Sequence, residues 1–235
     1  MVSPSWRDVA ELMVGPRPAG SSEVVEVFDR EADRYDAWFD SPEGRTLFQS
    51  EVEAVGLLLK DLPGPVLEVG VGTGRFAEAL RVPYGIDPAL GVLRLAHRRG
   101  IRVVRVRGEG LPFPDRIFGG VLLIVTLCFS SPLSLLQEAK RVLRPDGALI
   151  IADILRDSAW GRWYLQKKLA GHPFYRHATF YTMQELQGFL TGVGFVLAEV
   201  ASAITQVPGD TLYAEPAYKG SEPKASFICL LGRMA

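Results

Sequence analysis

The chain of 235 residues is 48% hydrophobic and 23% charged, with a formal net charge of −1. Its size predicts one α/β domain with a substantial core, and its balanced charge excludes a general electrostatic attraction to nucleic acid. Arg7, Asp8 and Glu11 interrupt the N-terminal stretch, so no signal peptide is expected. The longest uncharged apolar run, 119–129, is too short to span a bilayer, which takes about 20 residues. We therefore expect a cytoplasmic protein.

Residues 1–61 are predicted to form a loose arm and a helical lid. The arm, 1–22, is rich in Pro, Gly and Ser, and 23–61 has the pattern of two helices. On the first helix, helical spacing places Phe28, Ala32, Tyr35 and Phe39 on one face, which is mostly aromatic. Ser41 is predicted to cap the second helix, with Pro42 at its first position. The predicted inner face of this second helix consists of Phe48, Val52, Val55 and Leu59.

Residues 62–235 are predicted to form the core, because strands and helices alternate from residue 65 onward. The strands are expected near 65–70, 83–87, 102–106, 119–126 and 147–153, and the helices near 74–81, 89–99 and 132–143. This alternation is typical of a doubly wound, mostly parallel sheet. A helix near 183–193 and strands near 195–205 and 224–232 complete the core.

Two segments of the core do not have a regular pattern. Residues 154–182 are rich in aromatic side chains and are predicted to be an irregular insertion on the substrate side. The loop 208–223 contains several Pro and Gly residues, so we expect it to be able to move.

The most informative stretch runs from Glu68 to Gly74, where an apolar strand ends in an acidic residue and three glycines alternate with other residues. A dinucleotide fingerprint, G-x-G-x-x-G, would need glycine where this chain has Arg75. Glu68 favours a ligand that carries positive charge, and the second acidic strand end, Asp87, suits the two hydroxyls of a ribose. S-adenosylmethionine, with its ammonium, sulfonium and ribose, has these features.

Four segments in this order resemble the class I S-adenosylmethionine-dependent methyltransferases, in the group that includes the ubiquinone and menaquinone biosynthesis methyltransferases. The segments are Glu68-Val-Gly-Val-Gly-Thr-Gly74, Gly85-Ile-Asp-Pro88, Gly108-Glu-Gly-Leu-Pro-Phe-Pro-Asp115 with Phe118, and Ala139-Lys-Arg-Val-Leu-Arg-Pro-Asp-Gly147. The resemblance implies a Rossmann-like, seven-stranded sheet whose last strand is antiparallel. It also implies S-adenosyl-L-methionine as cofactor and a small-molecule methyl acceptor.

The resemblance and the expected sheet geometry together suggest a set of cofactor-binding residues. Ligands of such sheets bind at the carboxyl ends of the strands. Asp87 is expected to take the ribose hydroxyls, and Tyr35 is expected to reach the methionine end. The predicted set is Tyr35, Glu68, Gly70, Gly72, Gly74, Asp87, Pro88, Gly108, Glu109, Ile124 and Val125. The chain departs from the family pattern at Arg107 and Gly119, where many relatives have Asp.

The catalytic residues are not identified by the sequence. His172 and Tyr35 are candidates, and His177, Tyr175 and Tyr181 are further candidates for a general base if the acceptor must lose a proton. The aromatic side chains of 160–181 either pack as a lid or line a pocket for an apolar or aromatic acceptor.

Two other functions remain open on the sequence alone. The chain could bind S-adenosylmethionine or a nucleoside without catalysis, or it could be a nicotinamide-dependent oxidoreductase, which the missing fingerprint glycine disfavours. No metal site is predicted, because Cys128 and Cys229 lie in apolar runs and lack the spacing of metal ligands.

Overall fold

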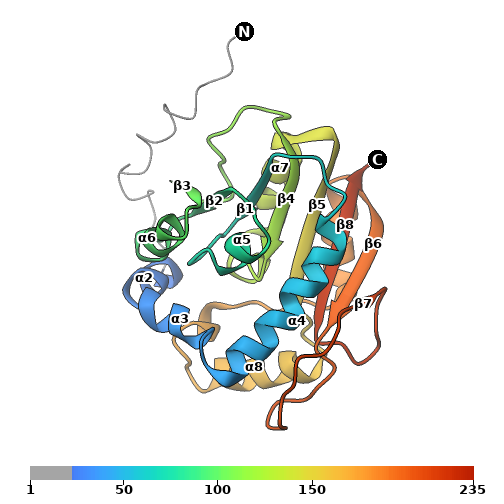
Figure 1. Ribbon diagram of the computed structural model, residues 1–235. Helices are drawn as coiled ribbons and strands as arrows, with labels where there is room; N and C mark the ends of the chain where they lie inside the picture. Colours follow the sequence, from blue (N-terminus) through green and yellow to red (C-terminus); the bar gives the residue numbers. More distant parts are fainter. Residues whose placement is uncertain (1–22) are drawn as a thin grey trace.

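The computed structural model of the protein describes residues 23–235, so the predicted arm, 1–22, lies outside the described residues. Its centre is an eight-stranded sheet in the order β3-β2-β1-β4-β5-β8-β6-β7 (Figure 1). The strands are β1 (Val66–Val69), β2 (Tyr84–Asp87), β3 (Arg102–Arg105), β4 (Phe118–Ile124), β5 (Leu143–Ile154), β6 (Phe195–Ala203), β7 (Tyr218–Lys219) and β8 (Phe227–Met234).

The sheet confirms the predicted doubly wound, mostly parallel class. The strands from β3 to β5 pair in parallel, whereas β8 is antiparallel to both of its neighbours, β5 and β6. The seven predicted strands are all present, and β7 is an additional two-residue strand in the loop 208–223. β5 begins at Leu143, earlier than predicted, because a bulged pairing with Phe118 carries the strand across Pro145 and Gly147.

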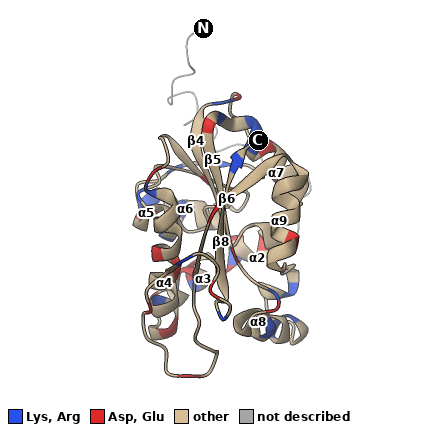
Figure 2. Ribbon diagram, turned by 90° about the vertical axis from the view of Figure 1, so that its right-hand side faces the viewer, with Lys and Arg blue, Asp and Glu red and all other residues tan. Residues whose placement is uncertain are grey.

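The helices cover both faces of the sheet. They are α2 (Glu23–Arg30), α3 (Ala32–Trp38), α4 (Pro42–Leu59), α5 (Arg75–Ala79), α6 (Leu90–Arg98), α7 (Pro132–Val142), α8 (Ala159–Leu169) and α9 (Met183–Gly192). Helices α4, α5 and α6 pack on one face, and α7 and α9 pack on the other (Figure 2). All seven residues of β4 are buried between the two layers, which explains its uninterrupted apolar sequence.

The N-terminal helices agree only in part with the predicted pattern. The first predicted helix is divided at Glu31, whose φ of −101° and ψ of 17° lie outside helical values. Ser41 caps α4 as predicted, since its Oγ accepts a hydrogen bond from the Gly44 backbone at 3.0 Å. The predicted inner face of α4 is confirmed only in part, because Val55 is buried whereas Phe48, Val52 and Leu59 are half-buried. The fully buried stripe is Gly44, Leu47, Ser50, Glu51, Ala54, Val55 and Leu58.

The aromatic segment 154–182 is more regular than predicted, because it contains α8 and the 3₁₀ turn η3 (Tyr175–His177). Ser158 caps α8 by accepting a hydrogen bond from the Gly161 backbone at 3.0 Å. Three aromatic residues, Trp160, Trp163 and Tyr164, lie at helical spacing and contact one another, so they form one aromatic stripe on α8. This spacing is that of an amphipathic helix, so the sequence contained a signal for α8 that the prediction did not use.

Helix α2 is joined to α6 by a hydrogen bond. The Asp29 carboxylate accepts from the Gly91 backbone N–H at 2.5 Å, whereas the N-cap residue of α6, Ala89, provides no side-chain cap. A Cβ on Gly91 would overlap the Asp29 carbonyl oxygen. The first turn of α6 therefore depends on a carboxylate supplied by α2.

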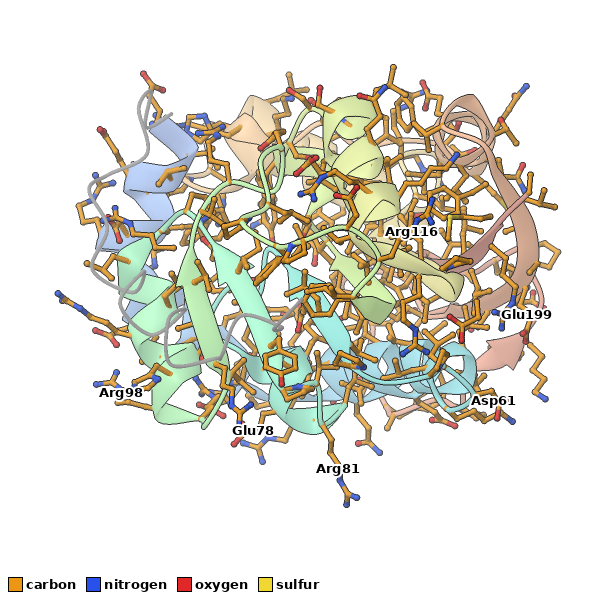
Figure 3. The ribbon with its side chains drawn as sticks, turned by 90° about the horizontal axis from the view of Figure 1, so that it is seen from above. Asp61, Glu78, Arg81, Arg98, Arg116 and Glu199 are labelled. Carbon is orange, nitrogen blue, oxygen red and sulfur yellow. The ribbon has the colours of Figure 1, made fainter. Side chains whose placement is uncertain are left out.

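Charged side chains mostly point outward, as Asp61, Glu78, Arg81, Arg98, Arg116 and Glu199 do in Figure 3. Buried carboxyl groups are the exceptions, and in the part of the chain that the structure describes they belong to Glu51, Glu68, Asp153 and Glu215. None of the helices within residues 23–235 has the length and apolar character needed to cross a membrane.

Candidate functional site

Two adjoining cavities lie at the carboxyl ends of the parallel strands. The small cavity has a volume of about 110 Å³, and the large cavity has a volume of about 490 Å³. They share lining residues, among them Phe28, Tyr35, Gly70, Gly72, Ile124 and Val125. Because α2 and α3 supply Phe28 and Tyr35, these helices cover the point where the cavities meet.

The structure brings most of the predicted site residues to these cavities. Besides the shared residues, Asp87, Pro88, Gly108 and Glu109 line the small cavity, and Glu68 lines the large cavity. Gly74 lines neither, because it packs against Ala96 of α6, whose Cα would lie 2.9 Å from an added Cβ.

The glycine loop requires glycine for two different reasons. Gly70 has a φ of +77°, and a Cβ there would overlap the Thr126 side chain. Gly72 has a φ of +52°, and the nearest atom to a Cβ is Cε1 of Tyr35 at 3.8 Å. Gly70 therefore lets the loop pack closely, while Gly72 leaves open backbone facing the cavities.

Asp87 connects the glycine loop to the start of α6. Its Oδ2 accepts from the Gly72 N–H at 3.1 Å, and its Oδ1 accepts from the Ala89 N–H at 2.9 Å. Burial raises the pKa of Asp87 to about 6 against the lowering effect of these two hydrogen bonds. Each carboxylate oxygen has a further lone pair, so Asp87 can act as a cap and still accept hydroxyl groups.

Glu68 is only 2% exposed, and its Oε2 has no hydrogen-bond partner within residues 23–235. Burial, followed by the charge of Asp87, holds its pKa well above the usual range, and a hydrogen bond from the Ala77 backbone opposes this shift. Glu68 thus ties the loop to α5 and leaves one buried oxygen at the large cavity.

The two departures from the family pattern, Arg107 and Gly119, lie at opposite ends of the parallel strands. Arg107 lines the cavity, and its Nε lies 3.8 Å from Oε2 of Glu109. The other oxygen of Glu109 accepts from the Ser131 backbone at 3.1 Å. At Gly119, a Cβ would overlap the Pro63 carbonyl oxygen, so backbone occupies the space that a side chain would need.

The large cavity has aromatic walls built from distant segments, including Trp38, Phe76, Trp163, Tyr164, Tyr175 and Phe180. His172 also lines it, stacked on Tyr175 with ring centroids 4.5 Å apart. Its Nδ1 is buried without a partner among the described residues. Its pKa is lowered by burial first, and then by Lys167 and Arg34.

The two remaining candidate bases, His177 and Tyr181, line neither of these cavities. Nε2 of His177 accepts from Nε of Arg176 at 2.8 Å, and Tyr181 packs on Phe189.

Two buried acids beside the large cavity are absent from the predicted set. Glu51, on α4, lines the cavity and is 8% exposed. Asp153, at the end of β5, is 1% exposed, and its Oδ2 has no partner among residues 23–235. Burial and the charge of Asp153 raise the pKa of Glu51 to about 8, and burial raises that of Asp153 to about 7. An acidic residue at the end of an otherwise apolar strand was the available signal for Asp153.

Arg75 links the glycine loop to α3. Its guanidinium binds Asp36 through two nitrogens at 2.9 and 3.0 Å, and it binds Asp40 at 2.7 Å. Arg99 adds a second contact to Asp36 at 2.9 Å. Burial alone would raise the pKa of Asp36, but hydrogen bonds from Arg75, Thr73 and Arg99 hold it at about 2. The residue that replaces the third fingerprint glycine therefore anchors the helix over the cavities.

The fold and the site define a class of protein: a doubly wound α/β protein with a glycine-rich, nucleoside-binding type of loop after β1, at the switch point of the sheet. Residues 67–151 match the family model described as a methyltransferase domain. A crystal structure from Thermotoga maritima, described as an S-adenosylmethionine-dependent methyltransferase and possible histamine N-methyltransferase, is 32% identical. It aligns with a TM-score of 0.83 over 90% of this chain and 100% of its own.

Two curated relatives extend the comparison. An uncharacterized protein of Mycobacterium tuberculosis is 38% identical over 227 residues, which cover 96% of this chain and 78% of the relative. A demethylmenaquinone methyltransferase of Thermotoga maritima is 29% identical over 141 residues, covering 56% and 62%. The chain belongs to the class I S-adenosylmethionine-dependent methyltransferases, and S-adenosyl-L-methionine is its cofactor.

The residues around the junction of the two cavities fit this cofactor. Gly72 leaves open backbone toward the cavities, Asp87 has spare acceptor capacity for hydroxyls, and Glu68 has an unpartnered buried oxygen near the expected positive charge.

Proposed function

We propose that the protein transfers the methyl group of S-adenosylmethionine to a small acceptor with an apolar or aromatic body, bound in the large cavity. One observation carries the proposal: an aromatic-walled cavity of about 490 Å³ adjoins the glycine loop and shares Tyr35, Gly70 and Gly72 with the small cavity. Pockets of this size and lining typically hold small organic ligands.

In this proposal the small cavity holds the nucleoside part of the cofactor. Asp87 accepts the ribose hydroxyls, and Glu68 provides negative potential for the methionine end. Gly108, Glu109 and Arg107 lie beside the adenine, while Pro88, Ile124 and Val125 form apolar walls. Helices α2 and α3 act as a lid, with Tyr35 at the junction of the two cavities.

The bound cofactor supplies an electrophilic methyl group on a sulfonium sulfur, so the protein mainly orients the reactants and excludes water. The pKa of Tyr35 is raised above its usual value, by burial first. Its phenol therefore stays neutral and positions ligands as a hydrogen-bond donor. Burial lowers the pKa of His172 and so favours its uncharged form. His172 can therefore take a proton only from a methyl acceptor that reaches its side of the cavity.

Two further arguments support this function. A protein that binds the cofactor without catalysis would have no need of acceptor space, whereas the large cavity provides it. The Thermotoga maritima structure is described as a possible histamine N-methyltransferase, and histamine is a small aromatic compound.

The test combines calorimetry with an acceptor panel. We expect S-adenosylhomocysteine to bind in the micromolar range and NAD to bind negligibly, because Arg75 replaces the fingerprint glycine. We expect methyl transfer to at least one small aromatic or apolar acceptor. Equal affinity for NAD would contradict the cofactor assignment, and transfer only to large polar substrates would contradict the acceptor assignment.

A further inference from the structure

Glu51 differs from the other buried carboxyl groups in its hydrogen bonding. Glu215 accepts from the backbone and hydroxyl of Thr205 at 2.6 and 2.7 Å. Asp153 accepts from the Ile154 N–H at 2.8 Å, and Glu68 accepts from the Ala77 backbone. Glu51 accepts no hydrogen bond from any residue in 23–235, although 92% of it is buried. Such a group is costly to bury, and this one is directed at the large cavity.

The cations that line the large cavity contact other groups, and none of them is among the charges that shift the pKa of Glu51. Arg75 is bound to Asp36 and Asp40, and Nη1 of Arg34 lies 3.7 Å from Glu31. Lys167 lies over the ring of Trp163, with Nζ 4.6 Å from its centroid. The inner end of the cavity is therefore acidic, and it attracts a cationic ligand and repels an anionic one.

Aromatic rings complete this end of the cavity. Tyr164 stacks parallel to Phe180 with centroids 6.0 Å apart, and it contacts Tyr175 at 4.5 Å. Rings of this kind attract an ammonium group through their faces. A carboxylate without donors, set among aromatic faces, matches an amine on an apolar or aromatic frame.

We propose that the methyl acceptor is a small amine and that Glu51 binds its nitrogen and takes its proton. The inference rests on the proposed function. The ammonium N–H bond breaks and its proton moves to the Glu51 carboxylate, which frees the nitrogen lone pair. That lone pair forms the new N–C bond as the C–S bond breaks with its electrons left on sulfur. The products are the N-methylammonium ion and S-adenosylhomocysteine.

The groups around Glu51 decide its pH dependence. They are Asp153 on β5, Cys229 on β8, Tyr35 on α3, Tyr164 on α8 and Tyr175 in η3. Glu43, on α4 itself, acts on the same two tyrosines, Tyr164 and Tyr175. None is cationic. The pKa values of the three tyrosines and of Cys229 are raised, by burial first, so these groups stay neutral while Glu51 titrates near pH 8.

The test is binding of phenethyltrimethylammonium, a permanent cation that has no proton to lose, to the full chain with S-adenosylhomocysteine bound. If the cation binds only ionised Glu51, its affinity rises up to roughly 90-fold from pH 6 to pH 9. In Glu51→Gln we expect only the few-fold rise that Asp153 contributes. Glu53→Gln, an exposed change on the same helix, serves as the matched control and should behave as wild type.

Binding and methylation of a panel of three related compounds complete the test. Among 2-phenylethylamine, 2-phenylethanol and 3-phenylpropanoate, the amine should be bound most tightly and methylated. Equal cation affinity of wild type and Glu51→Gln at pH 9, or preference for the alcohol or the acid, overturns the inference. If Glu51→Gln does not fold, the pH dependence of the wild type decides, and a flat profile overturns it. If the protein binds S-adenosylhomocysteine but shows no preference for the amine, only this inference is rejected. If it does not bind S-adenosylhomocysteine at all, the proposed function is rejected.

Discussion

The small and large cavities meet at Gly70 and Gly72, but they differ in the segments that line them and in the hydrogen bonding of their acidic residues. The small cavity is formed mainly by the segments that follow β1, β2, β3 and β4, under α2 and α3. Its carboxylates accept hydrogen bonds from the backbone, as Asp87 does from Gly72 and Ala89. The large cavity is assembled from side chains of α3, α4, α8 and η3. Glu51, which lines it, and Asp153, which lies beside it, keep oxygens that no described residue satisfies. The carboxylates of the small cavity are therefore fixed within the protein, whereas acids at the large cavity have oxygens available to a ligand.

The strongest test of this contrast is Gly70→Val, which alters the point where the cavities meet. The side chain would overlap Thr126 and force a β-branched residue to a φ of +77°, and such overpacking costs about 1–3 kcal/mol. We expect S-adenosylhomocysteine binding to be lost in calorimetry and the melting temperature to fall. Gly188→Ala is the control, because no atom lies near its Cβ. Normal cofactor binding by Gly70→Val would mean that the loop does not shape the small cavity.

Asp87→Ala tests the small cavity alone. Loss of charge-assisted hydrogen bonds to ribose removes on the order of 1.5–3 kcal/mol, so cofactor affinity should fall roughly 10- to 150-fold. Because the pKa of Asp87 is raised to about 6, wild-type affinity should also weaken as pH falls below about 6 and the carboxylate gains a proton. Calorimetry across this range measures both effects. Unchanged affinity in the variant would leave Asp87 as a helix cap only.

A pair of isosteric changes compares satisfied and unsatisfied acids within one protein. Glu215→Gln places an amide among the donors of Thr205 and should destabilise the fold by about 1–3 kcal/mol. Glu51→Gln removes a carboxyl whose folded pKa is raised to about 8.

A raised carboxyl pKa means that the native state holds the proton more tightly, so wild-type stability falls as pH rises from about 4.5 to 8. Glu51→Gln should abolish this part of the decline and raise stability at pH 8 by about 1 kcal/mol or more. Denaturant unfolding at pH 5 and pH 8 measures both variants. If Glu51→Gln were destabilised and Glu215→Gln were not, Glu51 would be the acid with satisfied hydrogen bonds and Glu215 the unsatisfied one, which contradicts the structure.

The smallest expected effect concerns the helices over both cavities. The bound cofactor should slow proteolysis between about residues 15 and 42, because ligand that binds the closed form stabilises it. Arg75→Gln should speed this cleavage several-fold by releasing Asp36 and Asp40. Equal cleavage rates with and without saturating S-adenosylhomocysteine would reject the lid.

The same ion pairs predict an acid response. The pKa of Asp36 is lowered to about 2, so its contribution is present above about pH 4 and is lost as pH falls toward 2. After allowance for partial exposure, it is on the order of 1–2 kcal/mol.

The sequence was informative where chemistry lies within a few consecutive residues. The glycine loop and the strand end at Asp87 carry both the fold and the cofactor site, because loop geometry needs glycine and parallel strands end at one edge. Glu51 was missed because an apolar-period interpretation of α4 assigns polar residues to the solvent side, whereas Glu51 lies on the buried stripe. Helix α8 was also missed, although Trp160, Trp163 and Tyr164 follow helical spacing. Both failures concern the large cavity, whose parts are brought together only by tertiary packing.

Because the Gly91 N–H donates a hydrogen bond to Asp29 of α2, the state of this amide at the start of α6 depends on the position of α2. Whenever α2 lifts, the Gly91 amide loses its acceptor and becomes open to exchange with solvent deuterium. If α2 moves as the proposed lid, deuterium exchange at this single backbone amide would measure how often the lid opens.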